Sequence, residues 1–543
     1  MKIQQLTAVL LSALLLLGGM TACKQSVPGN AQKPESGAKE QVLSAREKQS
    51  QAESEFLQEQ PRAAAPVETA SLKVTQKTSV RTVTETVRET IPAAKYTAVG
   101  QKFTGATKKV TWINVWYAST EQWFKPWTAS GAHFFVDGQW TGMDWDSEVF
   151  ARKVLQEIKA SGVSAVVFDC TNGMHDFVIA RCQKIATYCK EYGLEYCIAV
   201  GNADNNGINQ RAKLIWDNFA NPDCAYSSNY LIKDGKPTVI TYVVRSQFAS
   251  FAEDNLPYLE KFTRQWASGG EAAADKWGWQ LSPSQCSIPS KDSMFVSGSM
   301  FWKSDYAGWC KSMAYFDYNL LLASKSAPEY LILGSYDDVC EKNSWGLFDI
   351  QGSDYNTEDG YEAQQVDIFG NASVDAYYTR VCSWLSDEGP SVVSGGMLMD
   401  GAYEMKNRNS GYLLGTSNLV YGNEVTLEQV APIGDINDYV WLYHLGDNIY
   451  RVVRLAAGKS VAVSADDQEV GANLIQEFDA CTERQYWKLE KNNDGTYTFK
   501  NLETGLVMDV KRGSDAENAS LVSNTAAGTD SQKWEMKPVL LMK

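Results

Sequence analysis

Histidine and basic residues are in short supply in this sequence. The 543 residues include three histidines, His133, His175 and His444, so a zinc site built from imidazoles or a Ser-His-Asp triad has little material. Lys and Arg number 50 against 65 Asp and Glu, which gives a net charge of −15. Nucleic acids and anionic membrane surfaces attract clustered positive charge. We therefore expect no nucleic-acid partner.

Several catalytic and cofactor signatures are also missing. The chain has no CxxC pair, no GxSxG nucleophile elbow and no glycine-rich phosphate loop after its first expected strand. We expect no metal and no other cofactor, and a peptidase or esterase is disfavoured. By contrast, 17 Trp and 26 Tyr are present. Aromatic faces with carboxylates suit a sugar-binding or sugar-cleaving surface, although many of these rings are expected in cores.

The amino-terminal residues predict a secretory signal. Lys2 precedes the apolar run Leu6–Leu17, which is too short to span a membrane, and no later stretch approaches ~20 apolar residues. The run ends in GGMTAC, residues 18–23, which resembles the bacterial lipobox. That resemblance implies a signal peptide at 1–22 and a lipid on Cys23, which anchors the protein in the bacterial cell envelope, periplasmic or at the cell surface. An ordinary signal peptide is the alternative.

Residues 23–95 predict a flexible tether. They are rich in Gln, Glu, Ala, Lys, Ser and Thr up to about residue 95, with little apolar surface to bury. Ten cysteines follow Cys23, and several fall in apolar helix or strand patterns. We expect most of them to be buried small side chains. Disulfides between a minority of them are the alternative in an oxidising compartment.

Between residues 96 and 392 apolar strands alternate with amphipathic helices. Ser164–Asp169 is a buried-type strand, for example, and Ser147–Ala160 places Val154 and Ile158 on one helical face after Asp146 as the N-cap. Further helices are expected near Leu256–Trp266, Ala307–Ala323 and Val374–Leu385. Six or seven such units favour an α/β fold of the closed (β/α)₈ barrel type.

The residues that follow the expected strands are candidates for a site, because such barrels carry their chemistry at the carboxyl ends of the strands. Carboxylates recur there, and paired Asp and Glu groups are the machinery of glycoside hydrolysis. For any single Asp, a helix cap or loop hydrogen bond is the alternative. The substrate-binding candidates are Tyr117, Asn172, Asn202, Asp204, Trp302, Asp305, Tyr336, Asp337 and Trp345.

The segment 328–341, PEYLILGSYDDVCE, is the most specific part of this region. It resembles the late-strand motif of glycoside hydrolase family 71, and more loosely that of family 99, over roughly residues 105–350. Asp337 replaces the motif's Asn, and Cys340 its Gly. The resemblance implies that Asp338 and Glu341 are general base and general acid in either order, and that Asp169 is a third carboxylate that positions substrate. Retention or inversion stays open.

Residues 396–540 contain a threefold repeat. Trp441, Trp487 and Trp534 are spaced 46 and 47 residues apart, and the last two belong to QxW motifs. Each repeat also carries a glycine-led strand, so the pattern predicts an all-β unit in which the repeats bury one another's tryptophans. It resembles the ricin-type β-trefoil lectin.

That resemblance implies a sugar pocket only where an Asp follows the glycine-led strand. The third repeat has Asp509, with Asn524 and Gln532 downstream, whereas Gly415 and Ala462 occupy the equivalent positions. At most one pocket is therefore expected, and a purely structural trefoil is the alternative. Together these features predict an envelope glycoside hydrolase for an α-linked polysaccharide or glycan. A non-catalytic surface glycan-binding lipoprotein is the alternative.

Overall fold

The computed structural model describes residues 96–98, 102–103, 105–116, 132–136, 139–141, 144–201, 205–242, 256–267, 279, 291–298, 312–338, 344–350, 365–371 and 373–542. The expected signal peptide, the lipidation site Cys23 and the tether lie outside the described residues.

Parallel strands in chain order form the α/β region. From β2 to β9 each parallel strand pairs with the next along the chain. Strand β10 pairs with β11, which returns to pair with the first strand, β2. No pairing joins β9 to β10 in the described part of the chain. The described strands therefore form an α/β half-barrel, and the closed eight-stranded barrel is not shown. This curved sheet, which is open between β9 and β10 in the described residues, is called the ring below, and the face turned away from the helices is its inner face. The parallel strands are β2 (Lys108–Ile113), β5 (Ala165–Asp169), β6 (Glu195–Gly201), β8 (Lys236–Tyr242), β9 (Thr263–Ala267), β10 (Ser293–Val296) and β11 (Tyr330–Leu333).

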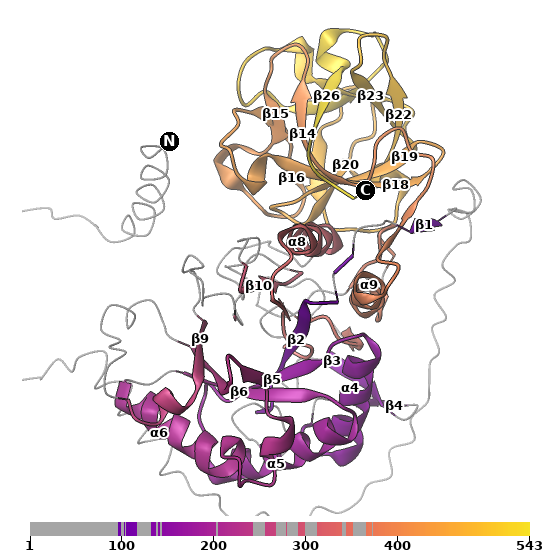
Figure 1. The fold of residues 1–543 in the computed structure, drawn as a ribbon. Coiled ribbons are helices and arrows are strands. Elements are labelled where there is room, and N and C mark those ends of the chain that lie inside the picture. Colours follow the sequence, from indigo (N-terminus) through magenta and orange to yellow (C-terminus); the bar gives the residue numbers. More distant parts are fainter. Residues whose placement is uncertain are drawn as a thin grey trace, which may run out of the picture. The chain divides into compact units, whose positions relative to one another are not determined.

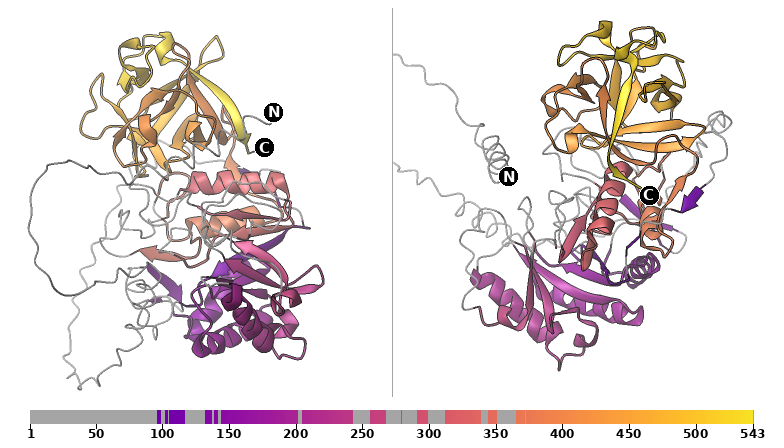
Figure 2. Two further views of the ribbon diagram at one scale, coloured as in Figure 1. Left: turned by 90° about the vertical axis from the view of Figure 1, so that its left-hand side faces the viewer. Right: turned by 45° about the horizontal axis from the view of Figure 1, so that its top comes forward.

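Three helices cover the outer face of this sheet, namely α4 (Glu148–Ala160), α5 (Asp176–Glu191) and α6 (Asn205–Ile215) (Figures 1 and 2). Helix α4 begins after Ser147, whose side chain accepts a hydrogen bond from Phe150 N at 3.4 Å. The expected N-cap Asp146 instead forms an ion pair with Arg181 at 2.7 Å. Val154 and Ile158 are buried as their spacing predicts.

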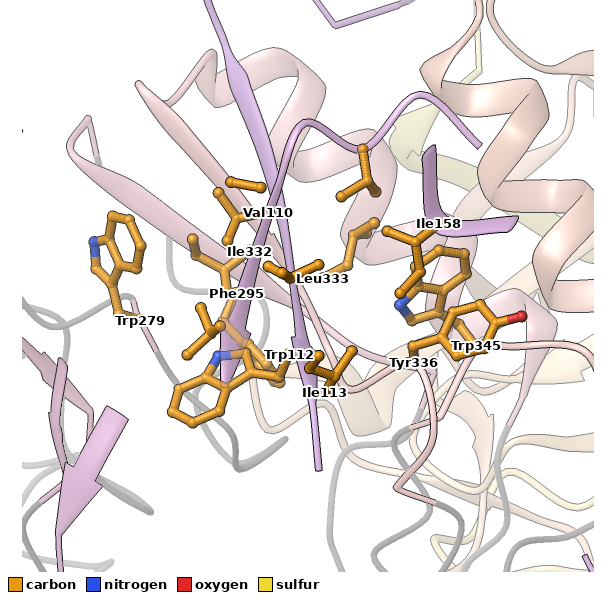
Figure 3. Packing of buried hydrophobic residues seen from close by; sticks show 14 of the residues in the cluster. Val110, Trp112, Ile113, Ile158, Trp279, Phe295, Ile332, Leu333, Tyr336 and Trp345 are labelled. Atoms are coloured by element: carbon orange, nitrogen blue, oxygen red, sulfur yellow. The ribbon is translucent and has the colours of Figure 1, made fainter. Parts of the chain in front are cut away.

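The two faces of the sheet differ in what they contact. Phe168 stacks on Tyr196, and Tyr196 contacts Phe219 beside α6, so these side chains point outward. Side chains alternate between the two faces along a strand. The residues that come directly before and after Phe168 and Tyr196 therefore point to the inner face, away from the helices. Figure 3 shows Trp112, Phe295 and Ile332 together on one side of β2, with Tyr336 and Trp345 on the other.

One expected helix is wrong, and others shift slightly. In the range Leu256–Trp266 the chain forms a 3₁₀ turn, Leu259–Lys261, and then strand β9, because Thr263–Ala267 pairs with β8. The later helices are α8 (Met313–Ser326) and α9 (Ala376–Leu385). The smaller strands are β1 (Tyr96–Ala98), β3 (Ala132–Val136), β4 (Gln139–Thr141), β7 (Ile232–Lys233), β12 (Phe348–Ile350) and β13 (Ser391–Val393).

Strands β14 to β26 form the carboxyl-terminal all-β domain, drawn orange to yellow in Figure 1. The repeat tryptophans Trp441, Trp487 and Trp534 are fully buried. The β-trefoil prediction is confirmed. The strands are β14 (Gly401–Asn407), β15 (Leu413–Gly415), β16 (Val425–Thr426), β17 (Glu428–Val430), β18 (Tyr439–Gly446), β19 (Ile449–Arg454), β20 (Lys459–Val463), β21 (Leu474–Glu477), β22 (Tyr486–Lys491), β23 (Tyr497–Asn501), β24 (Val507–Val510), β25 (Leu521–Asn524) and β26 (Trp534–Leu541).

A buried carboxylate joins α8, α9 and β18. Asp317 accepts hydrogen bonds from Arg380 Nε at 2.7 Å and Nη2 at 2.9 Å. Trp384 Nε1 and the Tyr443 hydroxyl each donate to it at 2.8 Å. This fully buried carboxylate of α8 therefore accepts from four donor groups, three on α9 and one on β18.

The described cysteines are all free thiols: Cys170, Cys182, Cys189, Cys197, Cys224, Cys382 and Cys481. The first four are buried, as expected of small apolar side chains. Within the same described ranges, no helix has both the length and the apolar character needed to cross a membrane.

Candidate functional site

Asp169 ends strand β5 on the inner face of the ring. Its Oδ1 accepts from Thr171 N at 2.9 Å and from the Thr171 hydroxyl at 2.7 Å, and its Oδ2 accepts from Trp116 Nε1 at 3.1 Å. The carboxylate is 1% exposed, and burial raises its pKa. Asp169 is therefore held in a fixed orientation at the carboxyl end of its strand.

Asp337 is fully buried after β11. It accepts hydrogen bonds from Trp145 Nε1 at 2.7 Å, from Asn114 N at 2.9 Å and from the Ser335 hydroxyl at 2.9 Å. Burial raises the pKa of Asp337 to about 6, against the opposing effect of these hydrogen bonds. All three donors come from the protein itself, so we reassign Asp337 from substrate binding to holding the ends of β2 and β11 together.

The aromatic residues beside Asp337 lie in the core. Tyr336 is fully buried, and its hydroxyl donates to Glu157 Oε2 of α4 at 2.5 Å. Trp345 is 1% exposed and donates to Thr111 Oγ1 at 2.9 Å and to Gly334 O at 3.0 Å. Burial raises the pKa of Glu157. Rings enclosed between sheet and helix cannot face a saccharide, so the substrate-binding expectation for Tyr336 and Trp345 is replaced by a packing role.

Asp338 is buried at the carboxyl end of β11. In the ring, β11 and β5 both pair with β2. Asp169 ends one of these two flanking strands, and Asp338 lies in the segment that follows the other. Asn172 is exposed in the turn after β5. The other expected residues of this site, Tyr117, Asn202, Asp204, Trp302, Asp305 and Glu341, lie outside the described residues.

In the third repeat of the trefoil, the three expected residues come together. Asp509 Oδ2 accepts from Asn524 Nδ2 at 3.0 Å and from Gln532 Nε2 at 3.0 Å. Asp509 is 4% exposed, and its Oδ1 has no hydrogen-bond partner. An unpaired buried carboxylate oxygen is costly unless a ligand or water donates to it.

The first repeat has no room for such a pocket. Gly415 takes the position of Asp509, and a Cβ placed there would lie 2.4 Å from Val430 Cγ2. Val430 pairs with Leu413 as Asn524 pairs with Val507, so Val430 takes the position of Asn524. Its side chain fills the space that a pocket would need.

The second repeat has a carboxylate, but on the opposite strand. Ala462 takes the position of Asp509, and Glu477 that of Asn524, as the pairing of Ser460 with Glu477 shows. Glu477 accepts from Gln485 Nε2 at 2.8 Å and forms an ion pair with Arg484 at 3.1 Å. Its charge is neutralised within the protein, so nothing in this cluster calls for a ligand.

The first repeat replaces the missing Gln of the QxW pattern by another residue. Gln532 Oε1 accepts from Ala527 N at 2.8 Å and Gly528 N at 3.0 Å, which closes the loop before its tryptophan. In the first repeat, Asp438 accepts from Ile433 N and Gly434 N at 2.6 to 3.1 Å. The loop is thus closed by a side chain one position earlier in the chain.

Two buried amides of the ring are not among the residues predicted from the sequence. Asn114 Nδ2 and Gln265 Oε1 have no hydrogen-bond partner, and both residues are at most 1% exposed. In the sequence they are marked only by their position. Asn114 directly follows the apolar strand β2, and Gln265 lies inside β9. No group of His, Cys, Asp and Glu that could hold a metal ion occurs among the described residues.

The comparison with sequence families identifies the carboxyl-terminal domain. Residues 438–524 and 483–539 match the family described as ricin-type beta-trefoil lectin domain-like. The domain defined by these residues is ricin-type β-trefoil lectin-like. This match lies within the trefoil and gives no support to the resemblance to families 71 and 99. No curated protein matches the chain.

Some solved structures are similar over a part of the chain. The designed threefold-symmetric protein ThreeFoil is 28% identical over 26% of this chain and 100% of its own, with a TM-score of 0.25. The Rhizoctonia solani agglutinin is 19% identical over 27% and 100%, with a TM-score of 0.24. An exo-beta-1,3-galactanase from Clostridium thermocellum is 20% identical over 34% of this chain and 36% of its own, with a TM-score of 0.27. At these TM-scores the likenesses carry no further conclusion.

Proposed function

We propose that this protein is a glycan-binding protein of the bacterial cell envelope that holds one saccharide in the third trefoil repeat. The observation that carries the proposal is the unpaired Oδ1 of Asp509, beside an Oδ2 that Asn524 and Gln532 hold in place. A carboxylate only accepts hydrogen bonds, so the ligand must donate, as sugar hydroxyls do. The lectin-like family of the domain agrees with this chemistry.

The test is binding of immobilised polysaccharides by the full chain and by Asp509→Asn. The panel contains α-glucans, α-mannans and β-galactans. We expect the wild type to be retained on at least one polymer and the variant to lose about tenfold or more in affinity, because hydrogen bonds to a charged acceptor contribute about 1.5 to 3 kcal/mol. The matched control is Glu477→Gln in the second repeat, which should bind as the wild type does. Equal binding by wild type and Asp509→Asn would contradict the proposal.

The second candidate function is glycoside hydrolysis of an α-linked glycan at the ring. The observation that favours it is the placement of Asp169 at the end of one strand that flanks β2 and of Asp338 after the other, with the pKa of Asp169 raised by burial. On this candidate Asp338 and Glu341 act as general acid and general base in either order, and Asp169 positions the substrate. On this candidate the described half-barrel is part of a closed eight-stranded barrel, and Glu341 supplies the partner carboxyl.

Hydrolysis is tested by reducing-end release from the same polymers. Asp169→Asn, Asp338→Asn and Glu341→Gln should each lower the rate by at least about 100-fold, since general acid-base catalysis contributes roughly 10² to 10⁴. Retention on a polymer without any release by the wild type favours the binding function alone. An undiminished rate in all three variants would exclude carboxylate catalysis at this place.

The proposed location follows from the amino terminus. A lipid on Cys23 and a tether of residues 23–95 hold the folded domains near a membrane surface, in the periplasm or outside the cell. Labelling with a fatty-acid analogue should mark the wild type and leave Cys23→Ser unmarked.

A further inference from the structure

On the inner face of the ring, three polar side chains belong to one row of paired residues, together with Ala199 and Ile240. Asp169 pairs with Ala199, Ala199 with Ile240, and Ile240 with Gln265. Ile113 pairs with Phe168, so the next residue, Asn114, continues this row beside Asp169. Paired residues of parallel strands point to the same face. The row therefore brings Asn114, Asp169 and Gln265 to the same level inside the ring.

Two members of this row have unmet hydrogen-bonding capacity of opposite kinds. Asn114 Nδ2 is a donor and Gln265 Oε1 is an acceptor, and neither has a partner although both residues are buried. Each unpaired buried group costs about 1 to 3 kcal/mol. Strands β2 and β9 stand four strands apart along the sheet, so a ligand that meets both amides has to reach across its inner face.

An aromatic side chain lies one step further toward the carboxyl ends of the strands. Tyr242 follows Ile240 by two residues on the same inner face, and it is half-buried, so solvent reaches it. Gly201 pairs with Tyr242, and a Cβ on Gly201 would lie 2.7 Å from Tyr242 Cβ and from its carbonyl oxygen. The absence of a side chain at position 201 thus lets the Tyr242 backbone approach closely.

We propose that Asn114, Asp169 and Gln265 form a binding subsite for one uncharged sugar unit inside the ring. Asn114 Nδ2 donates to one hydroxyl, Gln265 Oε1 accepts from another, and Tyr242 provides an apolar face. The inference rests on the proposed ring-borne glycan chemistry for its class of ligand. It adds two positioning residues that touch the sugar and take no part in proton transfer.

The test uses the full chain with Asp509→Asn, which removes the trefoil pocket. The probes are nigerotriose and an α-1,3-linked mannotriose, and binding is measured by titration calorimetry. We expect the Asp509→Asn protein to bind one of the two probes, and added Asn114→Leu or Gln265→Met to weaken that binding about tenfold, the loss of about one hydrogen bond. Both added changes should leave Tm near its starting value or raise it, because each removes an unpaired buried group. Asn114→Leu also removes the acceptor of a long hydrogen bond from Ser335 at 3.4 Å, but the Ser335 hydroxyl keeps Asp337 as its acceptor at 2.9 Å.

Thr241→Val is the matched control. Thr241 Oγ1 is also buried without a partner, but Thr241 pairs with Val200 on the outer, helix-facing side. It should raise Tm in the same way and leave probe binding unchanged. Gln265→Leu replaces Gln265→Met if the latter fails to fold.

Each outcome decides the proposal. Unchanged affinity in the Asn114 and Gln265 variants, or no binding of either probe by the Asp509→Asn protein, overturns the subsite. Probe binding that depends on these amides, without any release of reducing ends, supports the subsite and refutes hydrolysis. Loss of polysaccharide retention in Asp509→Asn is measured separately, so failure of the trefoil proposal is distinguishable.

Discussion

Replacing Asp400 by Asn should stabilise the protein at neutral pH and leave its stability unchanged at acid pH. Asp400 is 3% exposed, and its Oδ1 accepts from His444 N at 2.8 Å. Burial raises its pKa to about 7, against the lowering effect of that hydrogen bond and of Arg380, while Asp317 raises it further. The folded protein therefore binds the Asp400 proton more tightly than the unfolded chain does.

The sign and size of the effect follow from linkage. Between about pH 4 and pH 7, the folded state keeps the proton that the unfolded state has released, so stability falls as pH rises through this window and is flat above it. The shift from an ordinary value of 3.8 to about 7 corresponds to an upper limit of ~4 kcal/mol. An amide at position 400 keeps an oxygen for His444 N and carries no charge, which removes this slope.

The assay is urea unfolding of the full chain, followed by tryptophan fluorescence at several pH values from 3 to 8. The difference in unfolding free energy between Asp400→Asn and wild type should be near zero at the acid end and grow to several kcal/mol at pH 8. Asp466→Asn, at an exposed loop position, serves as the control and should show no such growth. Parallel curves for Asp400→Asn and wild type would refute the reasoning.

Three further predictions concern stability and are checked by the same unfolding measurement. Asp317→Asn should cost about 3 to 5 kcal/mol, because it leaves the buried Arg380 cation without its partner; a double change to Leu and Met at these two positions should recover most of the loss. Gly201→Ala should cost about 1 to 3 kcal/mol, since the new Cβ meets Tyr242 at 2.7 Å, and no loss would mean that the two strands separate freely. Ser312→Ala should cost about 1 kcal/mol, because the Ser312 hydroxyl caps α8 through Ala314 N at 3.2 Å; Ser312→Asp should restore it.

Local patterns in the sequence were sufficient to locate an element where that element buries one of its faces. The spacing of Val154 and Ile158 located α4, and the tryptophan spacing located the three repeats of the trefoil. The segment Thr263–Ala267 was predicted as part of a helix and forms a strand. It is a strand because it pairs with β8, a contact outside the segment itself, and its five residues are too few to show a helical or strand periodicity.

The trefoil pocket was easier to predict from the sequence than the residues of the ring, because only the pocket is marked by a local pattern. The cluster of Asp509, Asn524 and Gln532 follows a repeat, so comparing the repeats with one another identifies it. The burial of Asp337 and Tyr336 was not predictable, because the direction of each side chain after β11 depends on donors such as Trp145 and on α4. Amides such as Gln265 gave no signal, since only their unpaired state within the ring distinguishes them.

The three repeats together explain why a trefoil of this kind would act with a single pocket. Val430 fills the first position, Arg484 neutralises Glu477 in the second, and only Asp509 keeps an oxygen free. One sugar held through a few hydrogen bonds gives modest affinity. On the proposed lipid anchor, many copies share one membrane, so a polysaccharide that meets several of them is retained by their combined contacts. Such display makes a second pocket in each trefoil unnecessary for holding a long glycan, whereas a single soluble copy would release it.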